Sequence, residues 1–288
     1  LNYFIPGKVE EKGSVLIPSR IFANIINNFE GDKITLEVQD NKLTIQNDKT
    51  HLVIQGGSEE EFPIIPNIDA AQFIEINSKD LLISLNQVLR SAGAGLSKPE
   101  LNSVYCYQQD KDLYFVTTDT FRLSEKKILK NKYQENSINN INVIIPIKTA
   151  QELSRILQSI EESMVKIFIG NNQIFFDLSS ANLISRLIEG EYIQYKNIIP
   201  NSFDTEGLFN KKELQEAIKL VSLFSSKVND ICLETNIQSK ELIIKSQEVT
   251  IGQGIYKIAG NLTGEDLTIN FNYRYLLDGL ESIQGDKV

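Results

Sequence analysis

Side chains that could perform catalysis are few, and they form no known catalytic pattern. His51 is the only histidine, and it lies in a strand-like run without a serine or cysteine pattern beside it. Cys106 and Cys232 each lie inside a strand-like run, which favours buried structural thiols over a disulfide or a metal site. Gly93-Ala94-Gly95 lacks the lysine and the serine or threonine that follow in a phosphate-binding loop, so we expect a turn there. We therefore expect no enzymatic activity, no cofactor and no metal.

A different pattern recurs along the chain: helical stretches that carry basic side chains and amides on one face. On a helical wheel at about 100° per residue, the stretches 79–91, 148–160 and 211–225 each collect apolar side chains on one side. The outward residues are Lys79, Asn86, Gln87 and Arg90 in the first stretch, Lys148, Gln151, Arg155 and Gln158 in the second, and Lys212, Gln215, Lys219 and Ser222 in the third. In a shorter helix at 20–28, Arg20, Asn24 and Asn27 point outward.

The bulk charge of the chain opposes a general affinity for nucleic acid. The 288 residues carry a formal net charge of −9, and binding to phosphates depends on contacts from lysine and arginine. The outward helix faces could simply be solvated, as charged helix faces usually are. Their repetition in an acidic chain shifts the balance, because a symmetric assembly of repeated domains would direct these equivalent faces to one place. Apolar runs such as 143–147 are far too short to cross a bilayer.

A strand-to-helix unit appears three times at roughly the spacing of a domain. VIIPIKTAQELSRIL at 143–157 repeats VLIPSRIFANII at 15–26, with Pro146 in the place of Pro18 at an offset of 128 residues (146 − 18). A looser copy, INFNYRYLLDGL, lies at 269–280, where Asn272 takes the place of the proline. Repetition at this period indicates a chain built from repeated domains.

Strands and hairpins fill the intervals between these units. Alternating apolar and polar residues predict a hairpin at 34–38 and 42–45, a strand at 50–55, and a second hairpin at 165–169 and 174–176. We also expect strands at 1–9 and 14–17 and a single helix over 211–225. Proline-bearing segments at 59–68 and 189–202 are expected to be linkers. The predicted domains are therefore 1–66, 69–200 and 203–288, of which only the second is complete, so the chain is expected to be truncated at both ends.

Five segments give the chain a resemblance to a known family. They are EEEFPIIPNI (59–68), FVTTDTFRLSEK (115–126), VIIPIKTAQELSRIL (143–157), NLISRLIEGEYIQYKNIIP (182–200) and INFNYRYLLDGL (269–280). In this order they resemble the bacterial β sliding clamps, the processivity subunits of DNA polymerase III. The resemblance implies an α+β fold of repeated clamp domains, each with two helices packed on antiparallel sheets. It also implies that two crescent subunits join head-to-tail into a ring around duplex DNA in the cytoplasm, served by a clamp loader.

The resemblance assigns roles to three sets of residues. The residues expected to face DNA are Arg20, Asn24, Lys79, Arg90, Lys148, Arg155, Lys212, Lys219 and Arg274. Those expected to line a groove for short peptide motifs of polymerases and repair proteins are Leu101, Thr118, Thr120, Phe121, Arg122, Leu123, Ile193, Asn197, Ile198, Val228, Asn272 and Tyr275. Those expected at the subunit boundary of the homodimer are Leu52, Ile54, Leu223 and Phe224.

The groove departs from the usual pattern of the family at four positions. Thr120-Phe121 replaces a common Gly-His pair, Ile193 replaces a proline, and Asn197 replaces an arginine. For Leu101, Leu123, Ile198 and Val228, plain core packing is the alternative to a groove. For the whole chain, the alternatives to a clamp are an enzyme and a β-rich scaffold or binding protein without DNA. Nuclease or ATPase activity would indicate the first, and a monomer indifferent to DNA the second.

Overall fold

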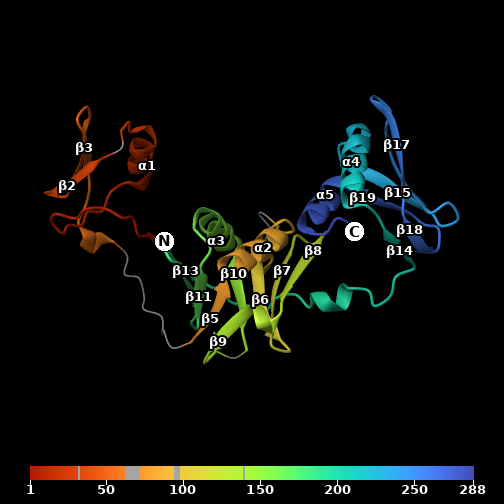
Figure 1. Cartoon of the computed structure of the whole chain (residues 1–288), viewed down its shortest axis with the longest axis horizontal. Helices are drawn as coiled ribbons and strands as arrows, with labels where there is room; N and C mark the ends of the chain where they lie inside the picture. The colour runs from red at the N-terminus through yellow and green to blue at the C-terminus, as the bar shows by residue number, and fades with distance from the viewer. Residues whose placement is uncertain (32, 63–71, 94–97, 139) are drawn as a thin grey trace. The chain divides into compact units, whose positions relative to one another are not determined.

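The computed structural model describes all residues except 32, 63–71, 94–97 and 139, and it divides into two compact units (Figure 1). One unit comprises Leu1–Tyr3 and Ile68–Val288, and the other comprises Phe4–Asn67. The predicted linker at 59–68 and the predicted turn at 93–95 lie partly outside the described residues.

The smaller unit is one helix packed on one antiparallel sheet. Helix α1 (Ser19–Asn28) precedes the sheet order β2 (Thr35–Gln39), β3 (Lys42–Gln46) and β4 (His51–Gln55). A 3-10 turn, η1, follows at Glu59–Glu61. Leu43, Ile45 and Ile54 are buried on one face of the sheet, where Phe22 and Ile25 of α1 pack against them. The core forms because alternate residues of a strand point to the same face and meet the apolar side of the helix.

The larger unit begins with two sheets that enclose a single core with two helices. The first sheet has the order β1 (Asn2–Tyr3), β13 (Ala181–Arg186), β12 (Gln173–Asp177), β11 (Met164–Ile169), β5 (Phe73–Asn77) and β9 (Tyr133–Asn136). The second has the order β10 (Asn142–Pro146), β6 (Ser103–Gln109), β7 (Asp112–Thr118) and β8 (Leu123–Ile128). Helices α2 (Ser78–Leu89) and α3 (Ile147–Ser159) lie side by side, and their apolar faces enter this core. Short 3-10 turns are η2 (Pro99–Leu101), η3 (Lys130–Lys132) and η4 (Tyr195–Ile198).

The C-terminal part of the larger unit has its own core. Strands β14 (Thr205–Leu208) and β18 (Asn261–Gly264) form a two-stranded sheet. A second sheet has the order β17 (Gly252–Ala259), β16 (Glu241–Glu248), β15 (Asp230–Asn236) and β19 (Thr268–Asn272). Helices α4 (Lys211–Val221) and α5 (Tyr273–Ser282) pack against each other and supply apolar side chains to this core. The predicted helix at 211–225 ends as an α-helix at Val221 and continues as a 3-10 turn, η5 (Ser222–Phe224).

Two of the predicted strands near the N-terminus are wrong. Of residues 1–9 only Asn2–Tyr3 pair in a sheet, and of residues 14–17 only Leu16 makes a bridge, to Gly57. Pro6 and Gly7 interrupt the first run, because proline lacks the amide hydrogen that a ladder needs and glycine weakens a strand. The remaining predicted hairpins and helices are confirmed within a few residues at their ends.

The helices begin in two ways that follow their sequences. Asn77, Asn210 and Asn272 cap α2, α4 and α5, because each side-chain oxygen accepts a hydrogen bond from a backbone amide of the first turn. Pro18 and Pro146 precede α1 and α3 and make no such bond. The strand-to-helix unit seen in the sequence is thus a strand that ends where a capped or proline-led helix starts.

Candidate functional site

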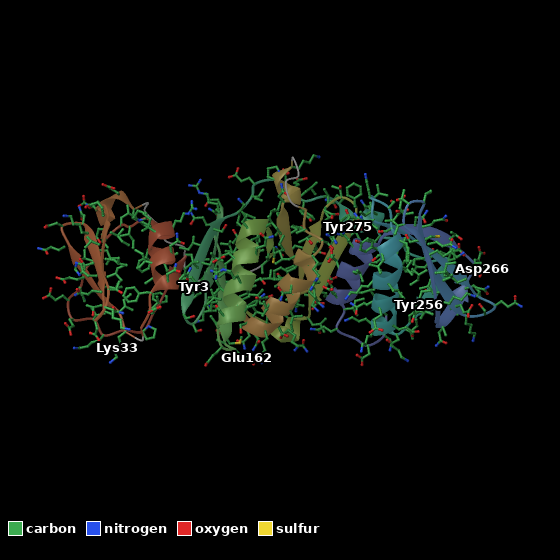
Figure 2. The ribbon with its side chains drawn as sticks, turned by 90° about the horizontal axis from the view of Figure 1, so that it is seen from above. Tyr3, Lys33, Glu162, Tyr256, Asp266 and Tyr275 are labelled. Carbon is green, nitrogen blue, oxygen red and sulfur yellow. The ribbon has the colours of Figure 1, made fainter. Side chains whose placement is uncertain are left out.

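On α2 and α3, two of the cations predicted to face DNA are each paired with a carboxylate. The Lys79 ammonium at the start of α2 forms an ion pair with Glu162, which also accepts a hydrogen bond from Asn77 Nδ2 at 3.0 Å. Arg155 Nε donates to Glu152 Oε2 at 2.9 Å within α3, and its Nη2 donates to the Tyr3 hydroxyl at 3.1 Å. Tyr3 and Glu162 are labelled in Figure 2.

These pairs also shift the titration of the carboxylates. The hydrogen bond from Lys79 holds the pKa of Glu162 below its ordinary value, and that from Arg155 does the same for the pKa of Glu152. Both carboxylates are therefore charged at neutral pH, and each neutralises the cation beside it.

Arg90 has a different environment, at the contact between α2 and α5. Its guanidinium forms an ion pair with Glu281 and lies 3.9 Å from Asp278 Oδ1. One turn earlier Gln87 Nε2 donates to the carbonyl of Ser282, and the Ser282 hydroxyl donates back to the carbonyl of Gln87 at 3.3 Å. Arg90 and Gln87 thus join two parts of the larger unit, a role that the helical wheel did not predict.

The other residues predicted to face DNA are exposed. Lys148 and Lys219 have no ion pair among the described residues, while Lys212 lies 3.9 Å from Glu216. The Arg274 guanidinium lies over the Tyr273 ring at 5.9 Å. Arg20 and Asn24 are exposed on α1 of the smaller unit. Exposure agrees with the predicted role, and contact with DNA stays a prediction.

The predicted peptide groove is ordered around Arg122 in the turn between β7 and β8. Arg122 Nε donates to Asp119 at 2.9 Å, its Nη1 donates to Asp278 of α5, and its guanidinium lies 4.4 Å from the centre of the Tyr275 ring. Burial alone would lower the pKa of Arg122, but the hydrogen bonds that it donates to Asp278 and Asp119 outweigh burial, so the pKa is raised. Arg122 therefore stays charged and fixed in direction. Tyr275 is labelled in Figure 2.

The backbone of the same turn is held by side chains of its own sequence. Asp119 accepts hydrogen bonds from the amides of Phe121 and Arg122, at 3.0 and 2.9 Å. The Thr118 hydroxyl donates to the carbonyl of Arg122 at 2.6 Å and accepts from the amide of Thr120 at 3.1 Å. Thr120 has a φ of +76°, and Phe121 is 80% exposed at the tip of the turn.

The other predicted groove residues divide by burial. Leu101 is buried, which agrees with core packing, the alternative to a groove. Exposed side chains are those of Ile193, Asn197, Ile198 and Val228. Asn272 caps α5, since its side chain accepts from the amide of Arg274. The start of α5 lies next to the turn that carries Val228, because the amide of Tyr273 donates to the carbonyl of Asn229 at 2.9 Å. The hydrogen bonds and ring contacts of the described residues bring Thr118, Arg122 and Tyr275 together. They do not link Ile193, Ile198 or Val228 to them.

A cluster of tyrosines, missed by the sequence analysis, lies beside the predicted linker. Tyr105, Tyr107 and Tyr114 stack across β6 and β7, and Tyr192 stacks on Tyr105 with ring centres 4.7 Å apart. The Tyr107 and Tyr195 hydroxyls are 2.6 Å apart, and Tyr195 also donates to Glu125. Burial raises the pKa of Tyr192 and Tyr195. The spacing of Tyr105 and Tyr107 on one strand face was the signal available in the sequence.

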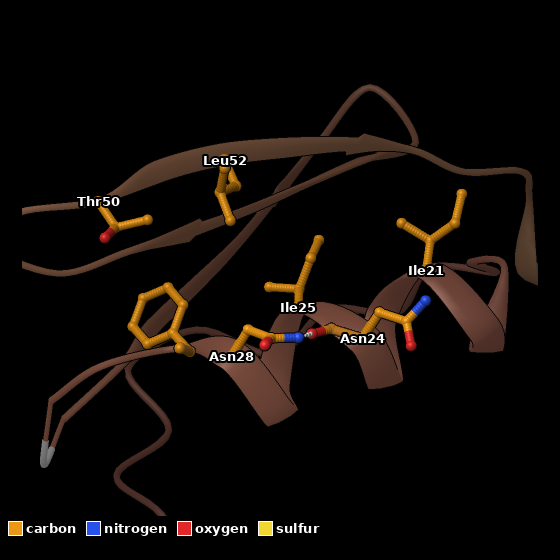
Figure 3. Close-up of a pocket in the computed structure, with 7 residues that line it drawn as sticks. Ile21, Asn24, Ile25, Asn28, Thr50 and Leu52 are labelled. Atoms are coloured by element: carbon orange, nitrogen blue, oxygen red, sulfur yellow. Dashed lines mark hydrogen bonds between the residues drawn. The ribbon is translucent and has the colours of Figure 1, made fainter.

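The four residues predicted at the subunit boundary differ in exposure, and the boundary itself stays a prediction. Leu52 is 36% exposed, and it lines a pocket of about 350 Å³ with Ile21, Asn24, Ile25, Asn28, Phe29 and Thr50, between α1 and β4 (Figure 3). Leu223 is 66% exposed in η5, the 3-10 turn that follows α4. Ile54 is only 5% exposed, because its strand face packs on α1, so its side chain offers little surface for the predicted contact. Phe224 is half-buried against Gly252 and Gly254 of β17.

Two observations concern metal ions and membranes. Within the described part of the chain, histidine, cysteine and carboxylate side chains do not gather in groups of three that could hold a metal ion. Nor do the described helices include one with the length and apolar character needed to span a membrane.

Three sequence families and several solved structures resemble this chain. Residues 2–66, 75–194 and 196–288 match the N-terminal, central and C-terminal domains of the DNA polymerase III beta subunit. The beta sliding clamp of Streptococcus pneumoniae TIGR4 is 29% identical over 287 residues, which cover 96% of this chain and 72% of that protein. That of Staphylococcus epidermidis RP62A is 29% identical over 285 residues, with coverage of 98% and 74%.

Solved structures of sliding clamps and of DNA polymerase III subunit beta have a fold similar to that of this chain. The DNA polymerase sliding clamp from Bacillus subtilis superimposes with a TM-score of 0.88 at 27% identity, covering 99% of this chain and 77% of that one. The DNA polymerase III subunit beta from Pseudomonas aeruginosa superimposes with a TM-score of 0.87 at 22% identity, covering 98% and 76%, which bears on the fold alone.

Proposed function

The chain belongs to the family of the DNA polymerase III beta subunit, the sliding clamps, and we propose that it tethers the replicative polymerase to duplex DNA in the cytoplasm without catalysing a reaction. The observation that carries this proposal is the succession of three clamp-domain matches along almost the whole chain. The division into domains at 1–66, 69–200 and 203–288 is our own, and the ranges of those matches support it.

Enclosure explains how an acidic protein can stay on DNA. A closed ring cannot leave a long duplex sideways, so it needs few phosphate contacts to be retained. Each phosphate contact adds a salt-sensitive increment to affinity, and many such contacts would slow sliding. A net charge of −9 with a few local cations fits this requirement.

The DNA would meet the polar faces of the helices. We assign this contact to Arg20, Asn24, Lys79, Arg90, Lys148, Arg155, Lys212, Lys219 and Arg274. Support comes from the exposure of Lys148 and Lys219 without ion pairs among the described residues. Arg90 contributes less in this assignment, because Glu281 already binds its guanidinium.

Partner proteins, including a clamp loader, would dock through a short apolar and aromatic peptide at the surface around Arg122. The exposed Phe121 and the fixed Arg122–Tyr275 stack offer an aromatic contact and a charged contact side by side. Ile193, Asn197, Ile198 and Val228 are proposed as the continuation of this surface.

A second copy of the chain would close the ring at two free sheet edges. Among the described residues, strand β4 is an edge of the smaller unit's sheet and β17 is an edge of the C-terminal sheet, and an edge strand offers backbone groups for pairing with another chain. Leu52 belongs to β4 and lines a pocket there, and η5, which carries Leu223, contacts β17. We propose that these two surfaces meet across the subunit boundary.

The experiment is a comparison of circular and linear DNA. The protein is assembled on nicked circular duplex with a clamp loader and then washed at a salt concentration that removes phosphate contacts. Retention on the circle and release after the DNA is cut once are the expected results, because only enclosure survives the wash. Equal retention before and after cutting, or no retention on the circle, would overturn the proposal.

A further inference from the structure

The cations on the faces of α2 and α3 are of two kinds. Lys79 and Arg155 are each in contact with a carboxylate, Glu162 and Glu152. Lys148, on the same helix as Arg155, has no ion pair among the residues that the structure describes. All of these side chains are substantially exposed, so the difference lies in their partners and not in their burial.

The two ion pairs contribute little to the stability of the fold. The side chains of Lys79 and Glu162 are 66% and 47% exposed, and those of Arg155 and Glu152 are 61% and 32% exposed. Water screens pairs of this kind, and their net contribution to folding is small. Their effect on an approaching anion is larger, because a cation that already holds a carboxylate presents little net charge.

We propose that Glu162 and Glu152 limit how strongly these helix faces hold DNA, by competing with its phosphates for Lys79 and Arg155. This inference rests on the proposed function, since it takes these faces to be the ones that meet DNA. A phosphate that replaces the carboxylate leaves a negative charge close to the duplex, so part of the gain is lost to repulsion. Weak holding is what a sliding ring needs.

The neighbouring contacts suit this role. Asn77 Nδ2 donates to Glu162, and Asn77 Oδ1 accepts from the amide of Lys79, so the first turn of α2 places the carboxylate and the ammonium together. Arg155 Nη2 donates both to Glu152 Oε1 and to the Tyr3 hydroxyl, so two partners hold the guanidinium in place. The lowered pKa of each carboxylate keeps it charged at neutral pH, so the competition persists there.

The sequence supplies a matched control for Glu162. Glu161 is the adjacent residue, is exposed, and has no ion pair among the described residues. Glu161→Gln and Glu162→Gln change the net charge of the protein equally and at nearly the same place. Only the second frees Lys79, and glutamine can still accept the hydrogen bond from Asn77.

The experiment measures the affinity of the dimer for a short linear duplex over a series of salt concentrations. For Glu162→Gln and for Glu152→Gln we expect the slope of log affinity against log salt to steepen by up to about 0.9, and affinity at about 0.1 M salt to rise up to about eight-fold. Glu161→Gln should leave the slope unchanged. In the background of Lys79→Ala, Glu162→Gln should lose its effect, since the freed cation is missing.

The outcomes separate the inference from the function on which it rests. If Lys148→Ala and Lys79→Ala both leave the slope unchanged, these faces do not meet DNA, and the assignment of the helix faces fails. If Lys148→Ala flattens the slope but Glu162→Gln and Glu161→Gln behave alike, the competition by carboxylates is overturned while the assignment stands. Thermal unfolding of each variant identifies a change that comes from misfolding.

Discussion

At the scale of single residues, Arg122 combines more roles than any other side chain of the proposed groove. It bonds Asp119 in its own turn, reaches Asp278 on α5, and lies over Tyr275. A planar guanidinium can do all three because its donors lie in fixed directions and its face can stack. The same residue therefore shapes the groove and joins the central part of the larger unit to the C-terminal part.

Two replacements of Arg122 should show whether peptide binding depends on more than the positive charge of this residue. We expect Arg122→Ala to weaken a short apolar and aromatic peptide about ten-fold, as loss of an anchoring arginine does. Arg122→Lys should weaken it nearly as much, because lysine keeps the charge but loses the fork and the stacking. Titration calorimetry measures both, with Arg186→Ala as an exposed control. Unchanged affinity in the two Arg122 variants would remove the groove from this surface.

Thr120 carries backbone strain in the same turn. Its φ of +76° lies in the left-handed region, which a β-branched residue rarely adopts. A glycine occupies that region freely, although it costs more entropy on folding. We expect Thr120→Gly to raise the free energy of unfolding by about 1 kcal/mol. Urea unfolding measures this, and a destabilised variant would show that the threonine side chain holds the turn in a way its contacts do not reveal.

At the scale of elements, the contribution of an asparagine cap to the stability of its helix can be tested. The Asn210 side chain accepts from the amide of Glu213 at 3.0 Å at the start of α4. Asn210→Ala should lower the free energy of unfolding by about 1 kcal/mol, and Asn210→Asp should be close to neutral. Chemical denaturation measures the change, with the exposed Gln238→Ala as the control. An alanine variant as stable as the parent would mean that water caps the helix equally well.

Helices and hairpins could be predicted because their information is local. The apolar spacing of Leu81, Leu85 and Val88 marks the buried side of α2, and all three are in the core. Strand β9, with the sequence YQEN, was missed because it is short and polar and is a strand only through its pairing with β5. Strand β1 lies within the strand predicted at 1–9, but its short length is set by its pairing with β13 far along the chain. Such pairings depend on tertiary context.

The sequence predicts which residues of the candidate site are exposed better than it predicts which residues they contact. Exposure of Lys148, Lys219 and Leu223 follows from the helical wheel. The carboxylate that meets Lys79 lies 83 residues away at 162 and follows from no periodicity. The burial of Ile54 was not predicted, because alternation along a strand tells which residues share a face but not which face α1 covers.

At the scale of the whole molecule, the assembly of two copies is expected to depend on one exposed leucine. Leu223→Lys should convert dimers into folded monomers that no longer stay on circular DNA, because burying an unpaired ammonium in an apolar contact is costly. Sedimentation measures the oligomeric state and circular dichroism the fold. Leu129→Lys, at a similarly exposed leucine of the central part, is the control. An intact dimer after Leu223→Lys would defeat the proposed boundary.

The tyrosine cluster also gives the protein an optical signal of its own. Stacked phenol rings absorb as a coupled set, and the chain has no tryptophan to mask them in the near ultraviolet. Tyr192 and Tyr195 belong to the segment that leads into the C-terminal part, while Tyr105, Tyr107 and Tyr114 belong to the sheet beneath it. Near-ultraviolet dichroism can therefore report, without an added label, whether that segment stays docked while partners bind.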